Sequence, residues 1–493
     1  MSVPGVGPGG EHTIVALATP PGRGALALVR VSGPQALDVL RALTGRVSFA
    51  PRLATHVALR HPRDGTALDD ALVTWFPAPR SFTGDDTAEL SVHGGRAVVH
   101  AVLAACVAAG ARPAEPGAFT RRALLAGKVD LLQAEAIADL IDADTQAAHR
   151  VALAQLDGGL SRRLGALRSA CLEVEALLAY DIDFPEEDDG PIPPARVAAA
   201  VDALVSSLDA LLATAPAAAL AREGAIVVLA GAPNAGKSAL FNALVGEARA
   251  LVTDVPGTTR DALEVTLDTP GVPLRLVDTA GLRETDDVVE RLGIEVSARW
   301  LARAHVVLAC GETPAAVLAV ADAVRGLLPA ERRAVPVVGV LTKVDATRSA
   351  TSNATSNATS NATSDATRTA TSDATFGATP PASVAVAWVA TSAESGEGLA
   401  ALLDAVQREV TTRYGAIAPE VPLLTRERHR VAVAEARSEL DAFRTGWAGG
   451  AGVPAVVAAV HVRAAVEALD VVIGAVSVED VLDRLFASFC VGK

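Results

Sequence analysis

The stretch Ala225–Leu244, AIVVLAGAPNAGKSALFNAL, joins a run of apolar residues to a glycine-containing turn and then to a helical pattern. Its central part, Gly231–Ser238, matches the phosphate-binding pattern GxxxxGK[ST], between the strand and the helix that this pattern requires. Glycines allow backbone N–H groups to approach phosphates, and a helix N-terminus favours their negative charge. We therefore expect Lys237 to reach the β- and γ-phosphates of a nucleotide and Ser238 to bind Mg²⁺. A chance glycine-rich turn would not need the flanking strand and helix.

Two further patterns follow this loop in the order typical of a nucleotide hydrolase. The sequence DTAG, Asp278–Gly281, directly follows another apolar run. Asp278 would hold Mg²⁺ through a water molecule, and the Gly281 N–H would contact the γ-phosphate. Thr258 and Thr259, in the sequence PGTTRD, precede this motif, where a switch ligand to Mg²⁺ belongs. By themselves these two threonines could equally form an ordinary polar turn.

The sequence TKVD, Thr342–Asp345, also follows an apolar run and is similar to the guanine-specificity motif NKxD. We expect Asp345 to accept hydrogen bonds from guanine N1 and N2, Lys343 to pack over the base, and Ser392–Ala393 to form the last base-contacting loop. Thr342 replaces the usual Asn, so one hydrogen bond on the guanine side is left open. Asp345 favours GTP over ATP, which is the alternative nucleotide.

The order of strand-like and helical segments along the chain predicts several domains. Residues 223–415 alternate strand-like and helical segments, which predicts a GTPase domain with a parallel sheet and helices on both faces. Residues 1–125 read as an α+β domain, and residues 126–222 and 416–493 have helical spacing. The nucleotide domain is therefore predicted to be inserted into a discontinuous helical domain. Residues 346–383 carry Asn-Ala-Thr-Ser repeats and are predicted to be a disordered, low-complexity insertion.

Individual elements can be placed outside the nucleotide domain. Thr13–Ser32 reads as strand, loop and strand, and Leu37–Leu43 as a short helix. Thr87–Val92 is a strand candidate, and Ala97–Ala109 is predicted to be an amphipathic helix. Ala147–Tyr180 has apolar residues at helical spacing with few breakers.

Composition limits the classes of function. Lys and Arg number 43 and Asp and Glu 57, so the net charge is 43 − 57 = −14, which argues against a broad nucleic-acid-coating surface. The four cysteines are scattered without CxxC spacing, which favours a reduced, cytoplasmic protein. We see no signal peptide, and the longest apolar runs are strand-sized, so we expect no membrane span.

Beyond these motifs, long stretches resemble the MnmE (TrmE) family of tRNA-modification GTPases. They include TIVALATPPGRGALALVRVSGP, SFTGDDTAEL with the HGG that follows, RPAEPGAFTRRALLAGKVDLLQAEAIADLI, DFPEE and the C-terminal FCVGK. The resemblance covers nearly the whole chain, except for the repeat insertion and Thr342. It implies an enzyme that modifies C5 of the tRNA wobble uridine with an aminomethyl or carboxymethylaminomethyl group.

The resemblance also implies cofactors and partners. The N-terminal domain would form a homodimer and bind a tetrahydrofolate derivative, 5-formyl- or 5,10-methylene-tetrahydrofolate, as the one-carbon donor. An FAD-dependent partner similar to MnmG (GidA) would complete a heterotetramer that acts on tRNA. By motif position, Arg30, Glu89, Lys128 and Lys493 would contact the folate. Without the resemblance, the first three would be read as surface charges. Cys490 belongs to the family's FCVGK, and we expect it to be either a small buried residue beside Phe489 or a neighbour of the folate.

The route of hydrolysis is also implied by the resemblance. Leu282 follows Gly281, so the glutamine that orients water in many GTPases is missing. The family places K⁺ where an arginine finger would act, with hydrolysis dependent on dimerisation of the G domains. Its K⁺ ligands would be Asn234, Thr253, Val255 and Thr258. The family role of orienting water falls to Glu290, with Lys237 also catalytic and Thr259 joining Ser238 on Mg²⁺.

The predicted GTP-contacting residues are Asn234, Ala235, Gly236, Lys237, Ser238, Ala239, Thr253, Thr258, Thr259, Asp278, Thr279, Ala280, Gly281, Thr342, Lys343, Asp345, Ser392 and Ala393. Two other classes compete with the modification enzyme. One is a purely regulatory or ribosome-assembly GTPase, and the other is a scaffold whose altered motif at Thr342 no longer binds GTP.

Overall fold

The computed structural model describes residues 12–183, 193–247, 250–251, 263–278, 300–345, 388–417, 422–448 and 455–474, together with Phe486, Phe489 and Gly492. Contacts divide the chain into two compact units. Unit 1 consists of Met1–Asp142, Ala152–Leu212 and Glu427–Lys493, and unit 2 of Ala143–Val151 and Ala213–Arg426. Each unit is described by itself below.

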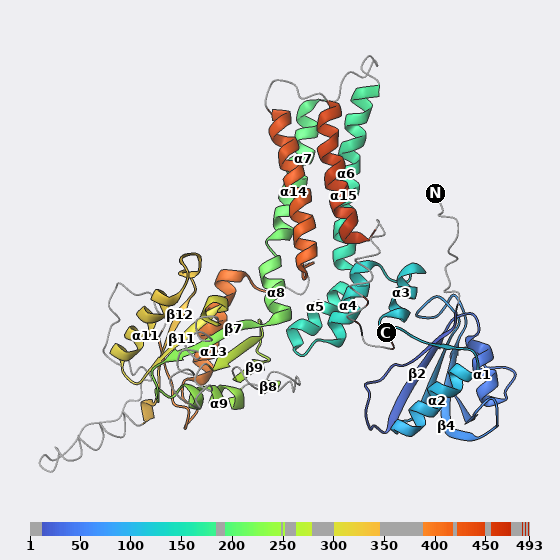
Figure 1. The fold of residues 1–493 in the computed structure, drawn as a ribbon. Coiled ribbons are helices and arrows are strands. Elements are labelled where there is room, and N and C mark those ends of the chain that lie inside the picture. Colours follow the sequence, from blue (N-terminus) through green and yellow to red (C-terminus); the bar gives the residue numbers. More distant parts are fainter. Residues whose placement is uncertain are drawn as a thin grey trace, which may run out of the picture. The chain divides into compact units, whose positions relative to one another are not determined.

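Unit 1 begins with a six-stranded sheet. In spatial order its strands are β3 (Thr55–Arg60), β4 (Ala67–Phe76), β5 (Thr87–His93), β2 (Leu26–Ser32), β1 (Ile14–Leu17) and β6 (Arg112–Pro113). Neighbouring strands are antiparallel, except that β6 pairs parallel with β1. Alternate residues are buried, so one face of the sheet packs against α1 (Ala36–Thr44) and α2 (Arg96–Ala108) (Figure 1). This arrangement confirms the predicted strand–loop–strand start, the short helix and the amphipathic helix.

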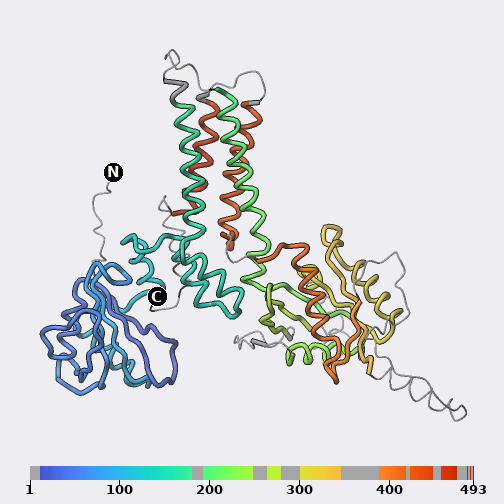
Figure 2. The backbone as a smooth tube through the Cα atoms, turned by 180° about the vertical axis from the view of Figure 1, so that it is seen from behind, coloured from blue at the N-terminus to red at the C-terminus, as the bar shows by residue number. Residues whose placement is uncertain are grey.

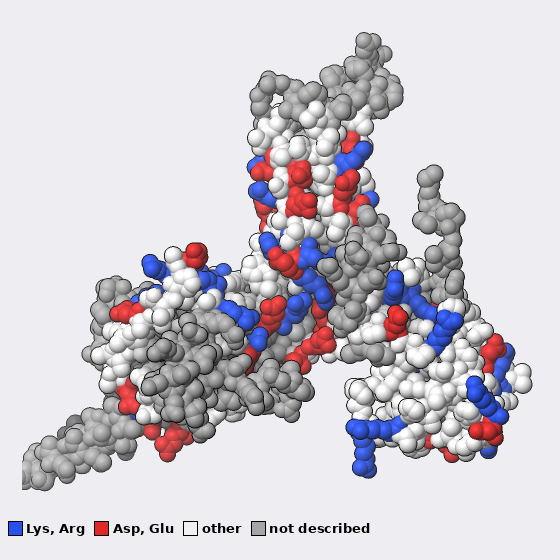
Figure 3. All heavy atoms as spheres, in the orientation of Figure 1, with Lys and Arg blue, Asp and Glu red and all other residues white. Residues whose placement is uncertain are grey.

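Four long helices make a bundle in the same unit. They are α6 (Gly159–Asp183), α7 (Pro194–Leu212), α14 (Glu427–Ala448) and α15 (Ala455–Ile473). The helices that precede and follow unit 2 in the chain lie side by side in both views of the backbone (Figures 1 and 2). On the face drawn in Figure 3, basic and acidic side chains are interspersed along the bundle. Two cross-bundle ion pairs, Arg437–Asp209 at 2.9 Å and Arg463–Glu175, belong to this pattern.

A buried ionic cluster joins one of the shorter helices of unit 1, α4 (Leu131–Ile141), to α14. Glu135 of α4 is 2% exposed. Its carboxylate accepts hydrogen bonds from Arg428 at 2.6 and 2.8 Å and lies 2.7 Å from Nε2 of the fully buried His429. Burial raises the pKa of Glu135, but the hydrogen bonds and charges of His429 and Arg428 outweigh it and lower this pKa to about 2. The cluster therefore holds an ionised carboxylate inside the unit.

Unit 2 contains a seven-stranded sheet. Its spatial order is β13 (Trp388–Ala390), β12 (Val337–Leu341), β11 (Val306–Gly311), β7 (Ala225–Gly231), β10 (Leu274–Asp278), β9 (Leu263–Leu267) and β8 (Ala250–Leu251). One face packs against α9 (Lys237–Glu247) and α13 (Leu399–Tyr414), and the other against α11 (Pro314–Leu327). The central strands β7, β10, β11 and β12 are almost wholly buried, as strands covered on both faces must be.

Two predictions about the fold need correction, and one edge strand was missed. The nucleotide-domain sheet is mixed rather than parallel, because β9 pairs antiparallel with both β10 and β8. The segment Ala147–Tyr180 is broken into α5 (Gln146–Leu156) and α6, since Gly158 takes a left-handed φ of +79° that ends the first helix. The edge strand β3 was not predicted.

The flanks of the predicted nucleotide domain pack with its sheet. Helix α8 (Ala215–Glu223) and the segment around Leu423 share a small apolar cluster, and the Leu424 N–H donates to Thr214 Oγ1 at 3.2 Å. Unit 2 accordingly extends beyond 223–415. The division into 1–125, 126–222, 223–415 and 416–493 stays a prediction about domains, and the 346–383 insertion lies outside the described residues.

One described stretch, Pro194–Glu223, is long and apolar enough to cross a membrane by length and composition, although a third of its most apolar window is already buried in the protein. It spans α7 and α8 and is longer than the strand-sized apolar runs expected from the sequence. The apolar face of α7, including Val201, Leu204 and Leu208, packs within the bundle.

Replacing Glu135 by Gln should destabilise unit 1. The change removes the negative charge that faces Arg428 and His429, and breaking such a buried pair costs about 3–5 kcal/mol in the free energy of unfolding. The matched control is Glu427→Gln, whose exposed pair with Arg430 contributes at most about 1 kcal/mol. Urea unfolding of the full chain measures both changes.

The same carboxylate should make stability depend on pH. The folded-state pKa of Glu135 is depressed to about 2 from its ordinary value of 4.5. Its contribution is therefore complete above the ordinary value and is lost as pH falls from there toward the folded pKa. Equal losses for the two variants, or an unchanged acid dependence in Glu135→Gln, would contradict this assignment.

Candidate functional site

The predicted phosphate-binding loop connects the central strand β7 to helix α9. Gly231 ends the strand beside β11, and a Cβ built there would lie 2.6 Å from the carbonyl oxygen of Cys310. Gly236 has a φ of +80°, and Asn234 takes a left-handed φ of +64°. Glycine adopts the positive φ at Gly236 without a steric penalty, and Asn tolerates the left-handed conformation at position 234. The loop sequence is thus explained by backbone geometry as well as by its motif.

The ammonium group of Lys237 lies inside this loop. Its Nζ donates to the carbonyl oxygens of Gly231 at 2.9 Å and Ala232 at 2.8 Å, and the residue is only 8% exposed. A buried cation bound to neutral carbonyls is well placed to pair with a phosphate, because charge-assisted bonds are stronger. The loop therefore presents a positive charge beside the N-terminus of α9.

A buried carboxylate lies near the loop. Asp278 ends β10, pairs in register with Leu229 of β7 and is fully buried. Burial raises the pKa of the Cys310 thiol to about 12, while the charge of Lys237 lowers it and that of Asp278 raises it. Both charges thus act on one thiol at the carboxyl ends of the parallel strands, where α/β sheets bind ligands.

Two side chains after β12 hold the loop from the other side. Thr342 Oγ1 donates to the carbonyl oxygen of Ala235 at 2.9 Å. Lys343 Nζ donates to the carbonyl oxygen of Asn234 at 3.1 Å and pairs with the Glu312 carboxylate. The predicted base-specificity motif and the phosphate-binding loop are therefore in direct contact.

The turn after β13 completes the base side of the site. The Ser392 N–H donates to the Glu397 carbonyl at 2.9 Å, and the Ser395 N–H donates to Ser392 Oγ at 3.2 Å. Gly398 takes a φ of +78° and passes so close to Ala390 that a Cβ would clash with its carbonyl. The tight turn brings Ala393 to the edge of a cavity.

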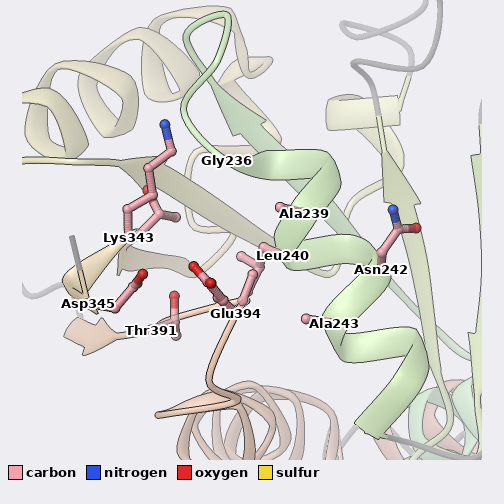
Figure 4. A pocket seen from close by; sticks show the side chains of 11 residues that line it. Gly236, Ala239, Leu240, Asn242, Ala243, Lys343, Asp345, Thr391 and Glu394 are labelled. Carbon is pink, nitrogen blue, oxygen red and sulfur yellow. The ribbon is translucent and has the colours of Figure 1, made fainter.

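This cavity of about 620 Å³ has the size of a small-molecule pocket. It is lined by Gly236, Ala239, Leu240, Asn242, Ala243, Thr342, Lys343, Asp345, Thr391, Ala393 and Glu394. In Figure 4 the side chains of Asp345, Thr391 and Glu394 lie near one another, facing Leu240 of α9. The cavity thus joins the phosphate-binding loop, the base-specificity motif and the last base-contacting loop.

The structure also brings together residues of the predicted folate site. Arg30 of β2 and Glu89 of β5 are register partners and form an ion pair at 2.8 Å, with side chains 14% and 26% exposed. The Arg30 guanidinium lies 5.6 Å from the ring centroid of Phe82 and 5.8 Å from that of Phe119. Lys128 is exposed, and its side chain passes close to Gly84. A Cβ built on Gly84 would lie 3.5 Å from the Lys128 Cε.

Among the predicted nucleotide residues, those of the phosphate-binding loop, Asp278, Thr342, Lys343, Asp345, Ser392 and Ala393 fall within the described chain. Several other predictions lie outside it, namely Thr253, Val255, Thr258, Thr259, Thr279, Ala280, Gly281, Glu290, Cys490 and Lys493. The described part of the chain contains no group of three or more His, Cys, Asp or Glu residues arranged to hold a metal.

Sequence reasoning missed several site residues. Glu394 directly follows Ser392–Ala393 and could have been found from its position. Glu312 follows β11 and pairs with Lys343, but no motif marks it. Phe119 has no local signal either, because its contact with Arg30 joins distant parts of the chain.

Comparisons with known proteins agree with this architecture. Residues 131–490 match the family model described as the MnmE helical domain, and residues 13–128 match that of the GTP-binding protein TrmE N-terminus. The tRNA modification GTPase MnmE of Methylorubrum populi is 44% identical over 488 residues, 98% of each chain. This chain belongs to the MnmE family. The predicted family is thereby confirmed.

Other relatives in the MnmE family match over similar lengths. The protein of the same name from Azoarcus sp. is 42% identical over 484 residues, again 98% of each chain. Among solved structures, the G domain of the T. maritima FeoB iron transporter aligns with 21% identity over 38% of this chain and 98% of that one. Its TM-score is 0.24, and no argument rests on it.

Replacing Gly231 by Ala should destabilise unit 2 of this MnmE-family chain. The new Cβ meets the Cys310 carbonyl, which cannot move without disturbing the β7–β11 ladder, so we expect a loss of about 1–3 kcal/mol. Gly246→Ala in α9 is the matched control, because open space surrounds Gly246 and Ala favours helix by up to about 1 kcal/mol. Calorimetric melting of both variants tests this. An unchanged melting temperature for Gly231→Ala would refute the close approach.

Proposed function

We propose that this GTP hydrolase of tRNA modification acts with an FAD-dependent partner to place an aminomethyl or carboxymethylaminomethyl group on C5 of the wobble uridine. The observation that carries the proposal is identity above 40% over 98% of the chain to tRNA modification GTPases. The contacts around the phosphate-binding loop support the hydrolase part. The paired charges of the N-terminal sheet support a site for the one-carbon donor.

In this proposal the nucleotide phosphates bind over the loop Asn234–Ala239. Lys237 exchanges its bonds to the loop carbonyls for bonds to the β- and γ-phosphates. The Ser238 hydroxyl and the buried Asp278 carboxylate are oxygen donors of the kind that Mg²⁺ prefers, and they would hold it. Mg²⁺ would supply charge neutralisation at the phosphates. Thr259, Thr279, Ala280 and Gly281 would complete the phosphate site, and Thr253 and Thr258 are further proposed GTP contacts.

Guanine would occupy the cavity beside α9. Asp345 accepts from the N1–H and N2 amino group, Lys343 covers the base, and the Ser392–Ala393 turn closes its edge. Each hydrogen bond from guanine to this carboxylate is charge-assisted and therefore stronger than a neutral one. This chemistry favours guanine over adenine, whose matching edge lacks the same donors.

Hydrolysis is proposed to depend on K⁺. The exposed Asn234, held in its left-handed conformation, offers an amide oxygen at the tip of the loop. Thr253, Val255 and Thr258 would add further oxygens when two G domains meet, and Glu290 would orient the attacking water. A monovalent cation there offsets charge that develops on the phosphates, as an arginine finger does elsewhere.

The one-carbon donor is proposed to be a tetrahydrofolate derivative at the N-terminal sheet. Glu89 can accept from the pterin edge, and Arg30 and Lys128 can pair with the carboxylates of the folate tail. Phe82 adds aromatic surface beside Arg30, and the fully buried Phe119 packs behind the Arg30 guanidinium. The described Gly492 packs against Leu17 of β1, which supports a place for Lys493 near this site.

The assembly is proposed to be a homodimer that joins an MnmG-like partner and tRNA in the cytoplasm. The sheet face opposite α1 and α2 leaves Leu26 66% and Leu72 49% exposed, which supports burial against a second copy. The mixed charges on the bundle face in Figure 3 do not form a broad basic surface, so much of the RNA contact would come from the partner.

Mass spectrometry of wobble uridines tests the function. Cells that lack this protein should lose the C5 modification, and the wild-type chain should restore it. Lys237→Ala should fail to restore it and should lack GTP hydrolysis, whereas Glu89→Gln should fail while hydrolysis persists. Arg325→Gln, in an exposed pair on α11, is the control that should behave as wild type.

Unchanged uridines in the deletion strain would leave a purely regulatory GTPase as the better reading. Full restoration by Glu89→Gln would instead overturn only the assignment of the folate site.

Hydrolysis should be faster in K⁺ than in Na⁺ at equal ionic strength. Asn234→Gly should remove this difference, because glycine adopts the left-handed φ of +64° but lacks the side-chain oxygen that is proposed to bind the cation. Steady-state phosphate release in the two salts measures the effect. Equal wild-type rates in both would count against the K⁺ site.

A further inference from the structure

Guanine presents chemically different edges to a binding site. The N1–H and the N2 amino group are donors, whereas N7 and O6 are acceptors. A carboxylate can only accept, and a threonine hydroxyl has a single hydrogen to donate. The side chains that line the cavity therefore determine which edge of the base can be read.

The hydrogen of Thr342 is already committed. Its Oγ1 lies 2.9 Å from the carbonyl oxygen of Ala235, and a carbonyl oxygen can only accept. Thr342 is 4% exposed and Ala235 is 6% exposed, so water has little access to replace this bond. The hydroxyl must remain a donor to the loop, and it has no second hydrogen for the base.

The other polar side chains that line the cavity do not replace this donor. Thr391 Oγ1 donates to the Leu341 carbonyl at 3.3 Å, and Lys343 Nζ is engaged by Asn234 and Glu312. Asp345 and Glu394 are carboxylates. In Figure 4 the Asn242 side chain extends away from Asp345 and Thr391. Lys343 Nζ has a third hydrogen, but in Figure 4 its ammonium extends away from Asp345 and Thr391. Beside Asp345, the described side chains of this cavity thus offer acceptors to a base and no uncommitted hydrogen.

We propose that Thr342 is a specificity-determining residue that leaves the N7 position of guanine unread. Recognition then rests on the N1 and N2 edge through Asp345, while Thr342 serves to hold the phosphate-binding loop. An Asn at this position would differ in one respect, because its amide carries two hydrogens. One could bind Ala235 and the other could reach N7. The inference rests on GTP being the nucleotide bound, as in the proposed function.

The test compares the affinities of three nucleotides for the full chain by calorimetry. 7-deaza-GTP replaces N7 by C–H, and ITP lacks the N2 amino group. The wild-type chain should bind GTP and 7-deaza-GTP with dissociation constants within about twofold of each other, and should bind ITP clearly more weakly.

Two variants sharpen the comparison. Thr342→Asn should bind GTP about threefold to tenfold more tightly than it binds 7-deaza-GTP, the range expected for one neutral hydrogen bond. Thr342→Ser keeps one hydroxyl hydrogen, so it should retain the wild-type ratio and serves as the matched control. The wild-type ratio decides the matter even if a variant does not fold.

A wild-type preference of fivefold or more (about 1 kcal/mol) for GTP over 7-deaza-GTP would overturn the inference. An unchanged ratio in a folded Thr342→Asn chain would do the same. If GTP and ITP bind equally well, reading through the N1 and N2 edge is wrong. Failure of every guanine nucleotide to bind would contradict the proposed function, and this inference with it.

Discussion

The nucleotide site of this chain depends on the hydrogen bonds by which the base-specificity motif holds the phosphate-binding loop. Lys237 takes the carbonyls of Gly231 and Ala232, Lys343 that of Asn234, and Thr342 that of Ala235. One of these donors belongs to the loop motif and two to the base-specificity motif. Phosphate and base sites are therefore built as a single bonded network, in which Thr342 and Lys343 hold the loop that Lys237 occupies.

The same constraint gives Thr342 a structural meaning. Thr342 keeps the bond to the phosphate-binding loop although it replaces the usual Asn. The motif is therefore still connected to the loop, which argues against a scaffold protein that no longer binds GTP. What changes is the number of hydrogens available to the base. A substitution at a nucleotide-binding position can thus keep a structural hydrogen bond while it reduces the number of hydrogen bonds to the base.

The two ends of the inserted region are secured by separate bonds. In unit 2, the Leu424 N–H is bonded to Thr214, so the entering and leaving segments are tied together. In unit 1, Arg428 and His429 of α14 converge on Glu135. In each unit, these bonds connect segments that are far apart in the sequence. Removing one partner of such a buried pair is strongly destabilising, because it leaves the other charge uncompensated.

Local patterns in the sequence were enough to predict the central strands of both sheets, most helices, the phosphate-binding loop and the base-specificity motif, because those features are encoded by residues that are neighbours in the chain. The tertiary structure decided the rest. The antiparallel course of β9, the bond from Thr342 to Ala235 and the pair between Glu135 and Arg428 join residues far apart in sequence. Such contacts form only when the chain packs, so local periodicity in the sequence does not predict them. The atom that accepts each hydrogen bond is likewise determined by that packing.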